Sequence, residues 1–295
     1  MKKSLVITFI GLTIIGLFNV TNKCISTSYS NNKVFTCKGI LNCLKYWFYG
    51  KGTIQDSGTL KTKELPIKGI KKINASGVGN LIIQQCEDPQ NCIEMLKISA
   101  DDNILPLLKQ VISGDQLTLE IEDNVSFSTK TPINYYVTVK DINSISTSGS
   151  MYIQSPSIST ANNLTIKSHG SGDIKIKNII ARQLEINQSG SATMKAHIHT
   201  DKLHIDTHGS GEITLSGNTN DQTIRQSGSG TYNAKELNSK TASFKQSGSG
   251  SILLTVIEKI TGTRSGAGSV TCNSQYNPET DIKNSGSGSV KKANW

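Results

Sequence analysis

Metal chemistry is the first possibility that the residue types of this 295-residue chain raise. All five histidines lie in the stretch 169–208. Because alternate residues of a strand face the same side, His197 and His199 would share one face. For the same reason His204, Asp206 and His208 would share another. Imidazole suits zinc, copper or nickel, but no fixed ligand motif is present, and solvent-facing strand positions explain these residues without a metal. We therefore predict no metal site, and an outward His/Asp cluster that binds one is the alternative.

Carboxylates that could cleave a polysaccharide are present but scattered. Asp201, Asp206 and Glu212 are close in sequence. Polysaccharide cleavage needs paired carboxyls, or a base with a cation, that converge on one groove. The spacing of these acids does not indicate such a pair. The Gly-rich turns are not phosphate loops either, because no Lys-Ser/Thr pair closes the motif. We predict no catalytic residue and no cofactor.

Six cysteines suit an oxidising compartment. Cys37 and Cys43 are separated by five residues, and so are Cys86 and Cys92, so each pair is predicted to form a local disulfide. The second pair encloses a Pro- and Asn-containing turn between two apolar runs, where a bridge would staple a hairpin. Cys272 falls at an inward strand position, and we predict a buried, unpaired thiol there.

A tandem repeat must position these residues. The motif Ser/His-Gly-x-Gly, or a one-residue variant of it, recurs through the C-terminal half in steps of 18 to 21 residues. Its first glycines are Gly149, Gly170, Gly190, Gly209, Gly228, Gly248, Gly266 and Gly286. A repeated sharp corner requires glycine either for a positive φ or because a neighbouring backbone leaves no room for a Cβ. A tandem period of this size predicts a stacked parallel β-solenoid.

Each repeat contains two pairs of apolar residues. The first pair stands four and six residues after the first glycine, as Ile174 and Ile176 do, and the second follows later, as Leu184 and Ile186 do. Spacing by two puts both members on one side of a strand, so each rung is predicted to hold two short strands. Two residues before the glycine runs a polar column that could hydrogen-bond along the rod, as Asn/Gln ladders do: Thr147, Ser168, Gln188, Thr207, Gln226, Gln246, Arg264 and Asn284.

The pattern changes before the repeat. Residues 64–142 are predicted to form a β-rich head with one short helix over Asn103–Ile112, and residues 143–295 to form the solenoid. Lys2 and Lys3 precede the apolar run Leu5–Phe18, which predicts a signal peptide or an N-terminal anchor in residues 1–28.

Residues 29–63 are predicted to form a basic linker or cap that holds the first cysteine pair. The aromatic cluster 46–49 could cap the end of the solenoid or contact a membrane, and Trp295 could cap the other end. The net charge of +9 suits polyanions or membrane phosphates, but without a base-stacking module we predict no nucleic-acid partner. Membrane contact is predicted only through the N-terminal segment, if it is uncleaved.

Three segments of the chain resemble one family. The runs "INASGVGNLIIQQ", "ISADDNILPLLKQVISGDQLTLEIED" and "PINYYVTVKDINSISTSGS", followed by the "SGSG" rungs, resemble the head GIN domain family of auto-transporter adhesins over residues 65–292. The resemblance implies an exported bacterial protein with a right-handed β-helical body, and it brings no catalytic residues. The Cys86–Cys92 pair and the Cys37–Cys43 region are departures from the family's pattern.

The sequence therefore predicts an all-β protein: a right-handed parallel β-helix or solenoid with rungs of about 20 residues, preceded by a small β-rich head. The predicted function is a non-enzymatic binding protein of the periplasm, outer membrane or cell surface, with surface glycans or envelope proteins as partners. A periplasmic scaffold that docks a partner and a polysaccharide lyase or hydrolase are the alternatives.

Overall fold

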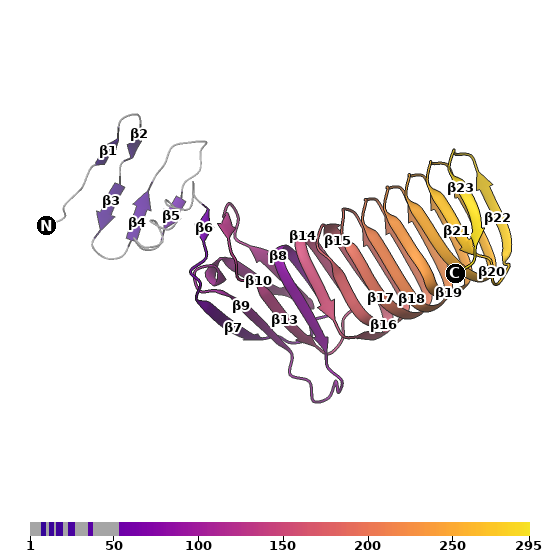
Figure 1. Cartoon of the computed structure of the whole chain (residues 1–295). Coiled ribbons are helices and arrows are strands. Elements are labelled where there is room, and N and C mark those ends of the chain that lie inside the picture. The colour runs from indigo at the N-terminus through magenta and orange to yellow at the C-terminus, as the bar shows by residue number, and fades with distance from the viewer. Residues whose placement is uncertain (1–6, 10–11, 15, 20–22, 27–34, 38–52) are drawn as a thin grey trace. The chain divides into compact units, whose positions relative to one another are not determined.

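A computed structural model describes residues 7–9, 12–14, 16–19, 23–26, 35–37 and 53–295 (Figure 1). The chain divides into two compact units, residues 1–56 with 123–129, and residues 57–122 with 130–295. Among the described residues, no helix is long and apolar enough to cross a membrane. Cys43 and the aromatic cluster 46–49 lie outside the described residues, so the predicted Cys37–Cys43 disulfide and the predicted role of that cluster stay predictions.

The first unit contains small sheets. Strands β1 (Ile7–Phe9) and β2 (Leu12–Ile14) pair antiparallel, and so do the neighbours in the order β3 (Gly16–Asn19), β4 (Lys23–Ser26) and β5 (Phe35–Cys37). The short strands β6 (Ile54–Gln55) and β12 (Phe127–Ser128) pair in parallel.

The second unit begins with the predicted head. Its strands lie in the order β7 (Leu60–Pro66), β9 (Met95–Asp101), β13 (Asn134–Val139) and β8 (Lys72–Gln85), and the hairpin of β10 (Leu108–Ser113) and β11 (Gln116–Ile121) joins β8. The predicted helix is only a single 3-10 turn, Leu105–Leu107. From Leu108 on, the segment is β10, because Val111 and Ile112 pair with β11 and stay half exposed instead of burying a helical face.

Rungs of parallel strands make up the rest of this unit (Figure 1). They are β14 (Ser144–Ser155), β15 (Ile158–Gly170), β16 (Ile174–Gln188), β17 (Thr193–Thr207), β18 (Glu212–Gln226), β19 (Thr231–Gln246), β20 (Ser251–Arg264), β21 (Ser269–Asn273), β22 (Glu279–Asn284) and β23 (Ser289–Ala293). The predicted β-solenoid is therefore confirmed. The same sheet continues across position 142/143, since β14 pairs in parallel along most of β8.

The interior of the solenoid is largely apolar, as predicted. The residues four and six positions after the first glycine are buried in the rungs from β14 to β21, and all of them except Ser155 are apolar. Members of the second pair are buried too: Leu164, Ile166, Leu184, Ile186, Leu203, Ile205, Ala242 and Phe244. Stacked rungs thus bury a face that no single rung could bury alone.

The glycine corners are imposed by close backbone approach. At Gly248 a Cβ would overlap the carbonyl oxygen of Gly228 one rung below. Gly149 and Gly190 also have a positive φ, of 82° and 135°, so at those two positions both predicted reasons apply.

The polar column that was predicted to form a ladder is buried inside these corners from Thr147 to Arg264, and its last member, Asn284, is exposed. Gln226 and Gln246 each donate a hydrogen bond of 2.8 Å to the carbonyl oxygen four residues ahead, and Gln246 also donates 2.8 Å to Oε1 of Gln226. Arg264 takes the same place in the next rung and donates to the carbonyls of Gly266, Gly268 and Gly286 and to Oδ1 of Asn284. The ladder is therefore structural, because it satisfies carbonyls that the corners turn inward.

Candidate functional site

The carboxylates that sequence analysis considered for catalysis do not converge. Asp201 and Asp206 both lie in β17, five residues apart, which on an extended strand is roughly 16 Å. Paired carboxyls that cleave glycosides lie about 5 to 10 Å apart. Glu212 begins the next rung and accepts a hydrogen bond of 2.8 Å from Thr214. The geometry does not bring these three acids together.

The structure tests the predictions for three cysteines, Cys86, Cys92 and Cys272. Cys86 and Cys92 form a disulfide, which confirms that prediction. It closes the loop between β8 and β9, but the two strands do not form a hairpin, because β13 lies between them and pairs with both. Cys272 is buried and free, as predicted, and burial raises the pKa of its thiol.

The histidines are exposed or half-buried on the outside of the rungs. Nε2 of His208 lies 2.9 Å from Oδ1 of Asp206, and its Nδ1 lies 2.5 Å from Oγ of Ser227, so this part of the predicted His/Asp cluster is paired internally. His197 and His199 face each other with their Nε2 atoms 3.2 Å apart. Within the described residues, no group of three or more His, Cys, Asp or Glu side chains is arranged to hold a metal ion.

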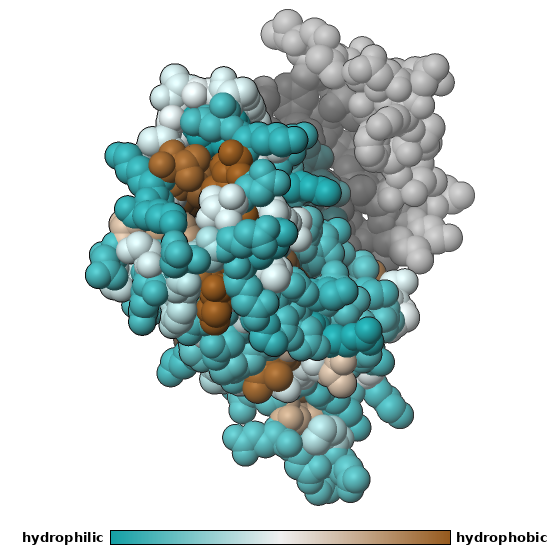
Figure 2. Space-filling view, turned by 90° about the vertical axis from the view of Figure 1, so that its right-hand side faces the viewer, coloured by the Kyte–Doolittle hydropathy of each residue, from teal (hydrophilic) through white to brown (hydrophobic). Residues whose placement is uncertain are grey.

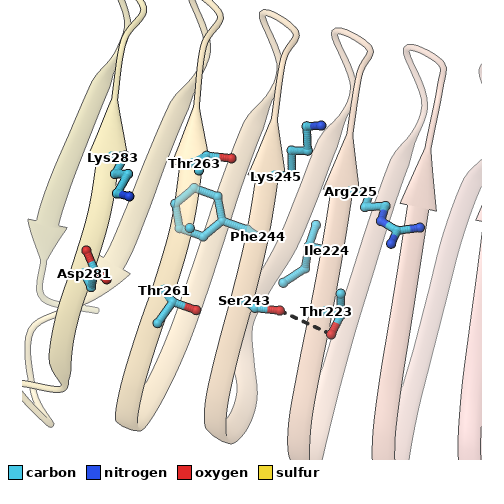
Figure 3. Close-up of a pocket in the computed structure, with 11 residues that line it drawn as sticks. Thr223, Ile224, Arg225, Ser243, Phe244, Lys245, Thr261, Thr263, Asp281 and Lys283 are labelled. Carbon is cyan, nitrogen blue, oxygen red and sulfur yellow. Dashed lines mark hydrogen bonds between the residues drawn. The ribbon is translucent and has the colours of Figure 1, made fainter.

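One concave surface feature is a trough of about 360 Å³ on the outer face of β18, β19, β20 and β22 (Figure 3). Its two walls are rows of outward side chains in register. Thr223, Ser243 and Thr261 form a hydroxyl row that ends at Asp281. Phe244 of β19 and Gly262 of β20 lie between the two rows. Because Gly262 has no side chain, it leaves room for the phenyl ring of Phe244.

The second wall is cationic. Arg225 lies beside Lys245, Lys245 beside Thr263, and Thr263 beside Lys283, at the spacing of neighbouring strands, about 4.8 Å. All three cations are exposed, and in the part of the chain that the structure describes none of them forms an ion pair. The trough is thus a rigid row of three free cations that faces a row of hydroxyl groups (Figure 3).

This cationic row was not predicted from the sequence, although the sequence contains a signal for it. Arg225, Lys245 and Lys283 each stand three residues before the first glycine of their repeat. In the four earlier rungs the same position holds Ser146, Lys167, Asn187 and Asp206, so it carries one cation there and three cations in the last four rungs. Aligning the repeats by their glycines and comparing the charge of that one position would have found it.

These features define an all-β parallel solenoid with a hollowed, polar side. The family described as "Putative auto-transporter adhesin, head GIN domain" matches residues 90–275, more than half of the chain, and the chain belongs to this family. No curated protein matches its sequence. A family of this description is typical of exported or surface proteins of bacteria.

Solved structures share the fold. A putative adhesin from Parabacteroides merdae ATCC 43184 is 22% identical, with a TM-score of 0.74, and the match covers 82% of this chain and 100% of that one. A putative lipid binding protein from Parabacteroides distasonis ATCC 8503 is 23% identical over the same shares, with a TM-score of 0.75. A putative adhesin from that same strain is 20% identical, with a TM-score of 0.71, again over 82% and 100%. At these identities the likeness concerns the fold alone.

Proposed function

We propose that this protein is a non-enzymatic, exported binding protein of the bacterial cell surface that holds acidic glycans in the trough of the solenoid. The observation that carries the proposal is the row Arg225, Lys245 and Lys283, three exposed cations that form no ion pair with any described residue, opposite the hydroxyl row. Carboxylate or sulfate groups complement the cations, and sugar hydroxyls complement Thr223, Ser243 and Thr261. Membership in an adhesin family supports the same function.

The rigidity of the solenoid favours a repetitive ligand. The sheet fixes the bases of Arg225 and Lys245 about 4.8 Å apart, and those of Lys245 and Lys283, which are two strands apart, about 10 Å apart. The backbone therefore needs no ordering when a polymer binds. A short anion would meet one or two cations, whereas a polymer can meet all three and the hydroxyl row as well. The trough is therefore expected to prefer an acidic polysaccharide to the corresponding monosaccharide.

The test compares two charge-matched triple variants of the purified protein. R225Q/K245Q/K283Q removes three positive charges from the trough, and K175Q/K177Q/K195Q removes three from exposed positions on the first strand segments of β16 and β17. Binding to uronate-rich and sulfated polysaccharides is measured by biolayer interferometry at several salt concentrations. Neutral polysaccharides and vesicles of anionic lipid serve as the other ligands.

Exposed ion pairs contribute about 0.2–1 kcal/mol each, so the loss of three of them should weaken binding of acidic polysaccharide by the trough variant roughly three- to 150-fold. The control variant should stay close to the wild type, and added salt should weaken binding by the wild type. Equal losses in both variants would mean that net charge alone attracts the polymer. Tighter binding to lipid vesicles than to polysaccharide would indicate a lipid ligand, as the description of the Parabacteroides distasonis lipid binding protein suggests for that relative. Release of reducing ends or unsaturated products from a polysaccharide would contradict the non-enzymatic assignment.

A further inference from the structure

A pair of histidines on β17 lies outside the trough and takes no part in the proposed function. His197 and His199 both project outward and are exposed, and their Nε2 atoms are 3.2 Å apart. The ring centroids are 4.9 Å apart and the ring planes cross at 75°. The rings therefore meet at their nitrogen corners instead of stacking face to face.

A neighbouring rung holds one of the two rings in place. Nδ1 of His197 lies 3.0 Å from Oγ of Ser216 in β18, and the two residues are direct neighbours in the sheet. When Nδ1–H donates to this hydroxyl, the lone pair of the imidazole is at Nε2, the atom that faces His199. Metal-binding histidines are oriented in the same way, by a partner that accepts from the ring nitrogen away from the metal.

The distance between the two nitrogens fits a shared metal ion. Imidazole nitrogens bind zinc at about 2.0–2.1 Å, so two of them at angles between 90° and the tetrahedral value lie about 2.9–3.4 Å apart. The observed 3.2 Å falls within this interval. Without a metal, the same contact is a hydrogen bond that requires a proton on one Nε2, and the ion would take the place of that proton. We propose that His197 and His199 chelate one divalent transition-metal ion through both Nε2 atoms.

The surroundings leave room for the remaining ligands of that ion. His199 lines a second hollow, of about 560 Å³, together with Asn218 and Asn220. Since the described residues supply no third His, Cys, Asp or Glu ligand, water would complete the coordination sphere. Two imidazoles with open positions favour ions late in the first transition row, with copper bound more tightly than nickel or zinc.

The experiment is calorimetric titration of the untagged full-length protein with CuCl₂, NiCl₂ and ZnCl₂, alongside the variants H197A, H199A, S216A and the control H204A. His204 is on the same strand but in its second segment, away from the pair. We expect one ion per chain, with affinity reduced at least about tenfold by H197A or H199A and unchanged by H204A. S216A should weaken binding by about ten- to a hundredfold, the usual effect of removing a partner that orients a metal-bound histidine.

Electron paramagnetic resonance of the copper complex supplies a second readout, because two nitrogen ligands should become one in either single variant. The substituted side chains are exposed or at the surface, so unfolding midpoints should stay unchanged and show that the variants fold. Binding of equal affinity in H197A/H199A and in the wild type, or no binding above that double variant, would overturn the proposal.

Discussion

At the scale of single residues, the unusual feature is a charged side chain in the core of the solenoid. Arg264 is 1% exposed, and its contacts are backbone carbonyls and the amide oxygen of Asn284. Gln246 occupies the same column one rung earlier and makes the corresponding bond to Gly250. The arginine thus extends the glutamine ladder into the last rungs, where its longer side chain reaches two turns at once.

This position predicts a graded loss of stability. R264A leaves several inward carbonyls without a donor and should lower the free energy of unfolding by about 3 kcal/mol. R264Q keeps a donor for Gly268, as Gln246 does for Gly250, and should cost at most about half as much. Urea unfolding followed by circular dichroism measures both. If R264Q were as unstable as R264A, the hydrogen bond from residue 264 to the carbonyl of Gly268 would not account for the stabilisation by Arg264.

A glycine corner gives the second prediction at this scale. A Cβ at position 248 would overlap the backbone of Gly228, which cannot rotate away as a side chain could. G248A should therefore lower the free energy of unfolding by about 3 kcal/mol, at the upper end of overpacking effects. S249A, an exposed change in the same turn, is the matched control. Equal urea midpoints for G248A and S249A would show that neighbouring rungs can move apart at this corner without loss of unfolding free energy.

At the scale of elements, the repeat period and the apolar pairs were sufficient to predict the strands and the side that they bury, because a spacing of two fixes the buried face. The segment Asn103–Ile112 was predicted wrongly for most of its length. Its apolar residues suit a helix in sequence, but the hairpin with β11 decides the outcome through pairing that is not local.

The candidate sites were less predictable than the strands. The trough depends on which residues of four rungs come into register, and the contact between His197 and His199 depends on side-chain rotamers and on Ser216 from the next rung. Neither follows from strand spacing alone. The polar ladder could be anticipated, because its members stand at one fixed position before each glycine.

The loop between β8 and β9 supplies a prediction for an element. Closing a loop of the size of Cys86–Cys92 contributes about 2 kcal/mol in the chain-entropy description, so C86S/C92S should lower the free energy of unfolding by that amount. Reducing agent should destabilise the wild type similarly. Any further effect of reducing agent on the double variant would report the predicted Cys37–Cys43 bridge, which peptide mapping would then locate. A double variant as stable as the oxidised wild type would contradict a stabilising role for the Cys86–Cys92 bridge.

At the scale of the second unit as a whole, both ends of the solenoid limit edge-to-edge pairing. At the first rung, β11 and β13 pair along β8. At the other end, exposed charged residues such as Lys283, Lys291 and Lys292 lie on or beside the last strands, and charges on an edge strand disfavour aggregation. Polar surface predominates at this end in Figure 2, with scattered hydrophobic patches. Trp295 folds back, donates 3.2 Å to Thr255 of β20, and lies under Lys235 of β19.

Because both ends of the solenoid are protected, its side is the surface that can bind a ligand. For the proposed surface adhesin, this side must be accessible from outside the cell. A recognition sequence for a site-specific protease, inserted between Gln275 and Tyr276 in the exposed loop that joins β21 and β22, makes this measurable. The decisive measurement is cleavage of this variant on intact bacteria, with permeabilised cells as the control. We predict cleavage on intact cells. Protection until the cells are permeabilised would contradict a surface adhesin and place the protein, with its trough, inside the envelope.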